Sequence, residues 1–152
     1  MHTLPLLTQQ FVELPPFFYS RVSPEPLTAP YWVAFNTDLA AELNLDTDFQ
    51  TTSNLAYLSG NAPQYAPAPI AGVYSGHQFG VYTPRLGDGR AILIGDSVDA
   101  AGQRQEWQLK GTGKTPYSRF ADGRAVLRSS IREYLCSEAM HGLGIPTTSA
   151  LA

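Results

Sequence analysis

The chain has 152 residues, of which 43% are hydrophobic and 15% charged, and its formal net charge is −3. This composition fits one globular domain with a buried core, and it argues against a disordered chain or a surface built mainly to bind nucleic acid. No stretch approaches the roughly 18 consecutive apolar residues of a membrane span, and the first residues lack the pattern of a signal peptide. We therefore expect a cytoplasmic protein with no membrane or nucleic-acid partner.

The first part of the chain is rich in proline. Six prolines lie within residues 1–30, among several aromatic residues. Because proline removes a backbone donor and fixes φ, this segment is predicted to be an extended arm with short turns that packs through its aromatic side chains. Short helices are expected at 36–44, with Asn36 as one capping option, and at 54–58. We assign residues 1–70 to an N-terminal extension.

Residues 71–152 have a different pattern, which predicts strands. Short apolar runs at 79–82 and 90–95 are separated by the proline- and glycine-rich turn at 83–89, and residues 106–110 alternate between polar and apolar. Three antiparallel strands in sequence are therefore expected.

A helix is predicted from Ala125 to His141, where apolar residues recur every three or four positions. Gly142, Gly144 and Pro146 then end it. The single cysteine, Cys136, lies within this pattern and is expected to be a buried structural residue. With the strands, the helix indicates an α+β fold with an antiparallel sheet.

A set of residues in this second part has the order of a phosphate site. The glycines of the turn Gly87-Asp88-Gly89-Arg90 allow backbone N–H groups to approach phosphate oxygens, and Lys110 on a following strand adds a positive charge. Such a lysine needs a partner, which in protein kinases is a glutamate on the next helix. Glu133 is placed for that role.

Each member of the set has an ordinary alternative. A Gly-x-Gly pair occurs in many tight hairpins, a strand lysine is usually solvated, and a helix glutamate is usually exposed. Residues 111–115 resemble the end of a Walker A loop, but position 108 is Gln108 instead of glycine, and Pro116 follows where a helix should begin.

Four arginines form a basic series at the start of the predicted helix: Arg119, Arg124, Arg128 and Arg132. The last three recur every four residues, which is typical of a solvated helix face but also suits a triphosphate beside a glycine loop. Asp122 has two interpretations as well, as an N-cap of the helix or as a contact to a ligand.

Several blocks together resemble the signature of the selenoprotein O family. They are Tyr74–Gly80, Leu86–Arg90, Gln108–Gly111, Thr115–Arg119, Asp122–Glu133 and, continuing the match, Gly142–Leu151, with residues 14–38 similar to the family's N-terminal segment. The resemblance is collinear, covers most of the chain and is more specific than any single motif.

The resemblance implies a pseudokinase-like fold, with residues 71–152 as a protein-kinase-like N-lobe whose helix corresponds to the kinase C-helix. It also implies an enzyme that binds ATP with magnesium, or with manganese in its place, and transfers AMP to Ser, Thr or Tyr hydroxyls of protein substrates. The nucleotide-binding residues that it implies are Gly87, Gly89, Arg90, Lys110, Asp122 and Gly123, with Glu133 orienting Lys110.

The family's catalytic base and metal ligands would lie after residue 152, so no catalytic or metal-binding residue is assigned within the chain. The 152 residues alone are expected to be inactive. Two other functions use the same residues: a kinase-type phosphotransferase, and a non-catalytic nucleotide-binding or scaffold pseudokinase.

Overall fold

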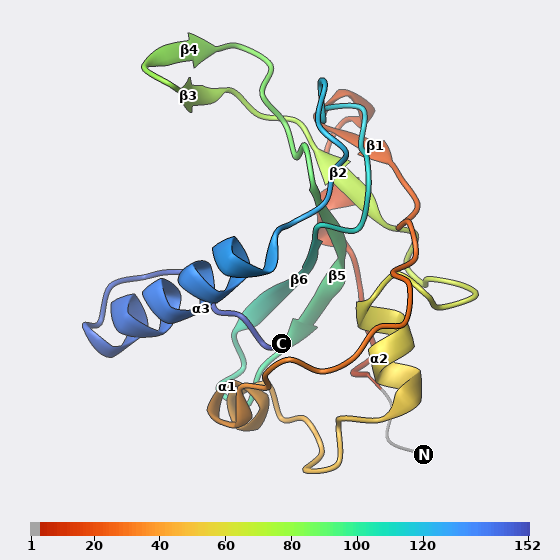
Figure 1. Ribbon diagram of the computed structural model, residues 1–152, viewed down its shortest axis with the longest axis vertical. Coiled ribbons are helices and arrows are strands. Elements are labelled where there is room, and N and C mark those ends of the chain that lie inside the picture. Colours follow the sequence, from red (N-terminus) through yellow and green to blue (C-terminus); the bar gives the residue numbers. More distant parts are fainter. Residues whose placement is uncertain (1–3) are drawn as a thin grey trace.

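The fold is α+β, and a four-stranded antiparallel sheet forms its centre (Figure 1). In the computed structural model of the protein, residues 4–152 are described. In spatial order the sheet contains β1 (Tyr19–Arg21), β2 (Ile70–Gly72), β5 (Ala91–Val98) and β6 (Arg104–Lys110). A separate two-stranded sheet contains β3 (Gly76–Gln78) and β4 (Val81–Thr83). Two 3-10 helices, Gln10–Glu13 and Pro16–Phe18, precede β1.

The pairing of the strands differs in part from the prediction. β5 and β6 pair antiparallel as expected, but β4 pairs with β3, and the neighbour of β5 on its other side is β2. The segment after β4 runs back alongside β2 and the residues that follow it. Two hydrogen bonds hold it there: the amide of Leu86 donates to the carbonyl of Tyr74 at 2.7 Å, and the amide of Asp88 donates to the carbonyl of Gly72 at 3.0 Å. The β3–β4 hairpin consequently projects from the body of the protein (Figure 1).

The core lies on one face of β5 and β6. Its buried cluster consists of Leu7, Leu43, Ile92, Ile94, Trp107 and Leu109. Trp107 and Leu109 are buried while Gln108 and Lys110 are exposed, which confirms the predicted alternation of β6. Residues from the predicted extension 1–70 share this core, and its boundary with 71–152 falls inside β2. The division into two units remains a prediction.

The two short helices begin close to the predicted positions. α1 (Thr37–Glu42) is capped by Asn36, whose Oδ1 accepts from the amide of Leu39 at 3.0 Å. α2 (Thr52–Leu58) is capped in the same way by Thr51. Each side chain satisfies one of the backbone donors that a helix leaves unpaired at its start.

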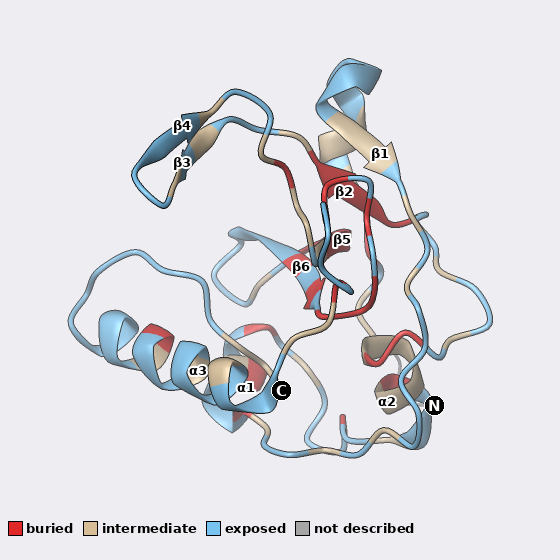
Figure 2. Cartoon of the chain, turned by 45° about the horizontal axis from the view of Figure 1, so that its top comes forward, coloured by how far each residue is buried: buried red, intermediate tan, exposed pale blue. Residues whose placement is uncertain are grey.

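The long helix α3 (Leu127–Gly142) is present, but its apolar side chains are exposed. Leu127 is 51% and Leu135 61% accessible, and Cys136 is exposed too, so its predicted burial is wrong. The reason is that the sheet's apolar face is covered from elsewhere: among residues 4–152, the core cluster and the side chains packed on it include none from α3. Figure 2 shows the buried residues gathered in β2 and β5 and scarce on α3.

No helix within residues 4–152 is long and apolar enough to cross a membrane.

Candidate functional site

Lys110 and Glu133 form an ion pair. Lys110 is the last residue of β6 and points away from the core, and its Nζ donates to Oε1 of Glu133 on α3. The structure thus brings together the two side chains that the sequence analysis paired. Both side chains are about half exposed, at 44% and 50%, so solvent screens the pair and it contributes only about 0–1 kcal/mol to folding.

The glycine turn ends beside this ion pair. In the register of β5 and β6, Ala91 lies opposite Lys110. The carbonyl of Arg90 accepts a hydrogen bond from the amide of Gly111 at 2.7 Å. The turn, the lysine and the glutamate, which the sequence placed in three separate motifs, thus lie at one end of the β5–β6 pair.

The turn itself is packed against the connection between β6 and α3. Gly87 has φ +71°, and a Cβ there would lie 2.5 Å from Cγ of Tyr117. The Oγ of Ser118 donates to the carbonyl of Gly89 at 2.5 Å. Gly87 is buried, Gly89 is partly accessible and Arg90 is exposed. Of the three predicted nucleotide-binding residues of this turn, Gly89 and Arg90 are therefore accessible to a ligand and Gly87 is not.

Asp122 and Gly123 lie in the same connection. Oδ1 of Asp122 accepts from the amide of Arg124 at 2.9 Å, and Val126 occupies the N-cap position of α3 without a side-chain cap, so the N-cap interpretation of Asp122 is wrong. Gly123 crosses Gly113 closely: the amide of Gly113 donates to the carbonyl of Gly123 at 3.3 Å. This crossing closes the connection into a loop anchored near the end of β6.

A pocket with two arginines lies next to the turn, and the sequence analysis did not predict it. A cavity of about 340 Å³ is lined by Thr83, Arg85, Leu86, Pro116, Tyr117 and Arg119. The guanidinium of Arg85 lies 5.9 Å from the ring centroid of Tyr117, and that of Arg119 donates to Gln78. Arg119 also has φ +55°, a conformation that is uncommon for residues other than glycine. Of the pocket's two arginines, the sequence analysis singled out Arg119 but not Arg85, because Arg85 lies outside the basic series.

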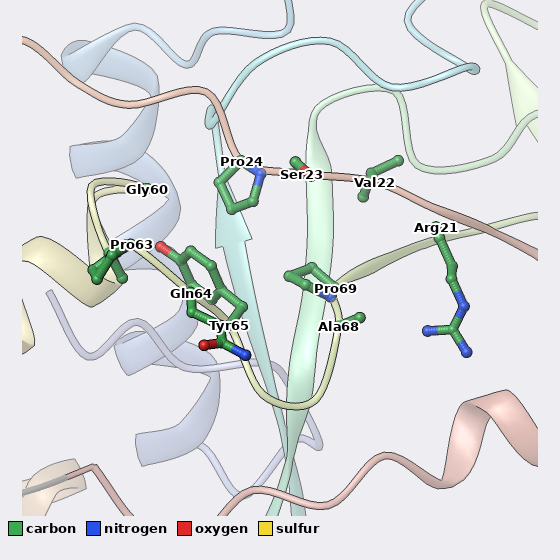
Figure 3. Close-up of a pocket in the computed structure, with 11 residues that line it drawn as sticks. Arg21, Val22, Ser23, Pro24, Gly60, Pro63, Gln64, Tyr65, Ala68 and Pro69 are labelled. Atoms are coloured by element: carbon green, nitrogen blue, oxygen red, sulfur yellow. The ribbon is translucent and has the colours of Figure 1, made fainter.

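A second cavity, of about 460 Å³, lies between the proline-rich arm and residues 60–69 and contains none of the predicted site residues (Figure 3). Tyr65 lines it and donates a hydrogen bond to the carbonyl of Tyr57. Burial raises the pKa of Tyr65 to about 12. Its phenol is therefore a neutral donor at physiological pH.

Within the described part of the chain, no three His, Cys, Asp or Glu side chains gather as a metal ion would require.

Comparison with known families identifies the chain. The model of the family described as "Protein adenylyltransferase SelO" matches residues 5–152. The chain belongs to the SelO family. Relatives called "Protein nucleotidyltransferase YdiU" match it along most of its length. The relative from Thiobacillus denitrificans is 53% identical over 155 residues, covering 100% of this chain and 32% of the relative. That from Paraburkholderia xenovorans is 57% identical over 145 residues, covering 93% of this chain and 28% of the relative.

A third relative, from Rhizobium meliloti, is 51% identical over 142 residues, covering 93% of this chain and 29% of the relative. This SelO-family chain thus spans only about 30% of the length of the curated relatives that it matches.

Proposed function

We propose that this SelO-family chain supplies the nucleotide-binding part of a protein adenylyltransferase. The reaction transfers AMP from ATP to a Ser, Thr or Tyr hydroxyl of a protein substrate. Because the chain spans about 30% of its relatives' length, the activity is proposed for a protein of their full length and not for these 152 residues alone. A cytoplasmic location is part of the proposal.

The proposal rests on the contacts that join the glycine turn, Lys110 and Glu133. The end of the glycine turn bonds to Gly111, next to Lys110, and Lys110 is paired with Glu133 on the following helix. A lysine on a strand, held by a glutamate on the next helix and beside a glycine-rich loop, is the arrangement with which protein kinases bind the phosphates of ATP. We therefore propose that β5, β6 and α3 form a kinase-like nucleotide lobe.

The residues have distinct parts in the proposal. Gly89 and Arg90 contact the phosphates through the backbone and the guanidinium, while Lys110 adds a point charge. Buried Gly87 lets the turn adopt its conformation, and Asp122 with Gly123 contacts the nucleotide from the connecting loop. Glu133 restrains the ammonium group of Lys110.

The chemistry follows from the reactants. The acceptor oxygen forms a bond to the α-phosphorus, the bond from that phosphorus to the bridging oxygen of the β-phosphate breaks, and pyrophosphate leaves while the hydroxyl proton passes to a base. Negative charge grows on the departing pyrophosphate, and nearby fixed cations such as Lys110 stabilise it. Magnesium, or manganese in its place, accompanies the nucleotide, but no metal ligand or catalytic base is assigned to this chain.

The test uses a chimera in which these 152 residues replace the matching segment of the Thiobacillus denitrificans relative. After incubation with ATP, magnesium and protein acceptors, mass spectrometry should find AMP on hydroxyl side chains. Lys110→Ala should abolish the product, whereas Lys114→Ala, which removes another exposed lysine, should not. Phosphate in place of AMP would support a phosphotransferase, and undiminished AMP transfer by the Lys110→Ala chimera would refute the proposed site.

A further inference from the structure

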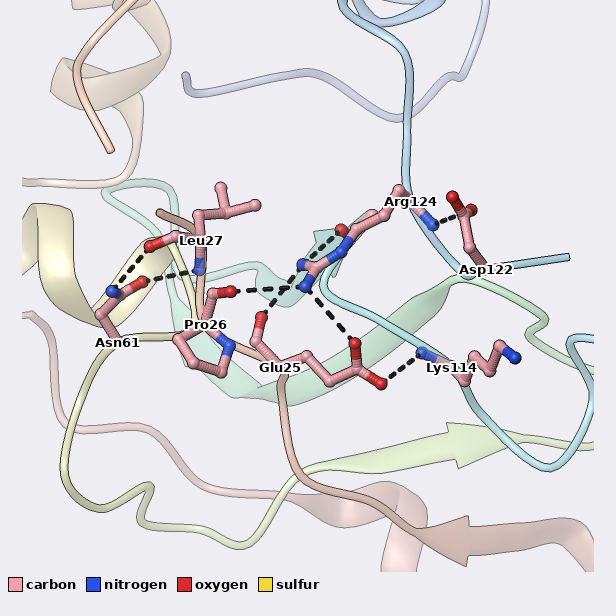
Figure 4. A network of polar contacts seen from close by, with 8 residues as sticks. Glu25, Pro26, Leu27, Asn61, Lys114, Asp122 and Arg124 are labelled. Atoms are coloured by element: carbon pink, nitrogen blue, oxygen red, sulfur yellow. Dashed lines mark hydrogen bonds and ion pairs between the residues drawn. The ribbon is translucent and has the colours of Figure 1, made fainter. Parts of the chain in front are cut away.

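The proline-rich arm reaches the loop that carries Asp122 and Gly123, and Glu25 makes the contact. The amide of Glu25 donates to the carbonyl of Thr112 at 2.7 Å. Its carboxylate accepts from the amide of Lys114 at 3.3 Å and from the guanidinium of Arg124 at 3.4 Å (Figure 4). A single residue of the arm thus binds the beginning and the end of the loop.

Arg124 completes the contact from the loop's other end. Its Nη1 donates to the carbonyls of Glu25 at 3.1 Å and Gly111 at 3.4 Å, and its Nη2 donates to the carbonyl of Pro26 at 3.3 Å. The guanidinium therefore joins the arm to the residue that follows Lys110. This arginine, which the sequence placed in a series suited to a triphosphate, makes its contacts within the protein.

Glycines allow these segments to approach one another. A Cβ at Gly113 would lie 2.5 Å from Cδ of Glu25, and one at Gly123 would lie 1.9 Å from the carbonyl oxygen of Gly113. One at Gly111 would lie 2.6 Å from the amide nitrogen of Ala125. Gly113 thus lies directly against the side chain of Glu25, and the two ends of the loop are in backbone contact with each other.

The arm is also held beyond Glu25. The side-chain amide of Asn61 accepts from the amide of Leu27 at 3.0 Å and donates to its carbonyl at 2.9 Å (Figure 4). The segment that presents Glu25 to the loop is therefore tied to the residues after α2, and it can act as a fixed support.

The energy of the pair is small on the scale of the whole fold. The side chains of Arg124 and Glu25 are 34% and 51% exposed, so solvent screens their ion pair and its contribution to global stability is small. The loop between β6 and α3 has no helix or strand of its own to hold it. The contacts of Glu25 and Arg124 therefore matter more for the loop's position than for global stability.

We propose that Glu25 and Arg124 are positioning residues for nucleotide binding. Together they hold the loop so that Asp122 and Gly123 stay next to Gly111 and Lys110. The inference rests on the proposed function, since it concerns the same nucleotide site, and it makes the N-terminal arm part of that site.

The test is an NMR titration of the ¹⁵N-labelled 152-residue chain with ATP and magnesium, at a temperature at which every variant is fully folded. Glu25→Gln and Arg124→Gln should each weaken ATP binding about tenfold, which corresponds to about 1.4 kcal/mol. The ATP-induced shift of the Gly123 amide should be lost while that of Gly89 persists. Arg124→Lys keeps the charge without the planar fork and should fall between wild type and Arg124→Gln.

The matched control is Glu42→Gln, which removes a similarly exposed carboxylate, 3.9 Å from His141 and outside the loop. It should bind ATP as wild type does. Lower melting temperatures with unchanged affinity in Glu25→Gln and Arg124→Gln would show a merely structural role and overturn the inference, leaving the proposed function intact. A wild-type chain without any ATP-dependent shift also overturns it, and the chimera then decides the proposed function separately.

Discussion

The hydroxyl groups of Ser20 and Tyr117 lie 2.8 Å apart, although 97 positions separate the two residues in the sequence. Ser20 belongs to β1, and Tyr117 belongs to the connection between β6 and α3. The ring of Tyr117 also covers Gly87. One side chain thus joins the outer strand of the sheet, the connecting loop and the glycine turn.

Substitutions of Tyr117 should separate these contacts. Tyr117→Phe loses one hydrogen bond and should lower the free energy of unfolding by about 1 kcal/mol. Tyr117→Ala also removes a buried ring, 8% exposed, and should cost about 3 kcal/mol or more. Urea denaturation measures both values, and equal losses would contradict the role given to the ring.

The crowding at Gly87 can be measured against a matched glycine. Gly87 and Gly102 both have positive φ, +71° and +78°, so an alanine pays a similar backbone cost of about 1 kcal/mol at either position. Only at Gly87 would the new Cβ meet the ring of Tyr117, since nothing lies within 4 Å at Gly102.

Gly87→Ala should therefore destabilise the chain by about 1–3 kcal/mol more than Gly102→Ala in urea denaturation. Part of this difference should disappear when both substitutions are compared in a Tyr117→Ala background, because the ring is then absent. Equal effects of the two glycine substitutions in the wild-type background would show that the ring moves aside freely.

Glu133 should matter for function more than for stability. Because its pair with Lys110 is about half exposed, Glu133→Gln should change the free energy of unfolding by less than about 1 kcal/mol. In the chimera it should lower AMP transfer about tenfold or more, since Lys110 loses the carboxylate that orients it. Glu106→Gln, which changes another exposed residue, is the control, and a similar loss of transfer there would make the effect non-specific.

The sequence predicted those features whose pattern is local. The alternation of polar and apolar residues in β6 predicted that Lys110 points away from the core, and the spacing of apolar residues predicted the helix α3. β2 was missed because it is only three residues long and follows Pro67 and Pro69, a context that favours a loop. Its pairing with β5 depends on residues distant in sequence, which no local pattern encodes.

The sequence likewise predicted one part of the candidate site and missed another. The Lys110–Glu133 pair follows from the order strand then helix, for which a known arrangement exists. The contact of Glu25 with Arg124 has no such signal, because neither residue belongs to a motif that pairs them and 99 positions separate them. The apolar stripe of α3 predicted the helix correctly, but it did not predict that these side chains are exposed. Periodicity does not show whether other segments, here the arm and α1, already cover the sheet.

The stability of the chain should fall at alkaline pH through Tyr65. Burial raises the pKa of this phenol from 10.0 to about 12, so the folded state favours the neutral form. Below about pH 10 the phenol is neutral in both states and the contribution of Tyr65 is fully present. As pH rises from about 10 to 12, the unfolded chain releases the proton first, so this contribution is progressively lost.

Tyr65→Phe isolates the effect. At neutral pH the variant should be about 1 kcal/mol less stable than wild type, because the hydrogen bond to Tyr57 is gone. Phenylalanine does not ionise, so only wild type loses stability as pH rises. Its advantage over Tyr65→Phe should therefore shrink and then change sign between about pH 10 and 12, when free energies of unfolding are measured by urea denaturation at each pH. The neutral-pH difference between the same two proteins is the internal reference. A wild-type advantage that stays constant across that range would show that Tyr65 ionises equally easily in both states, and one that grows would show that folding lowers its pKa.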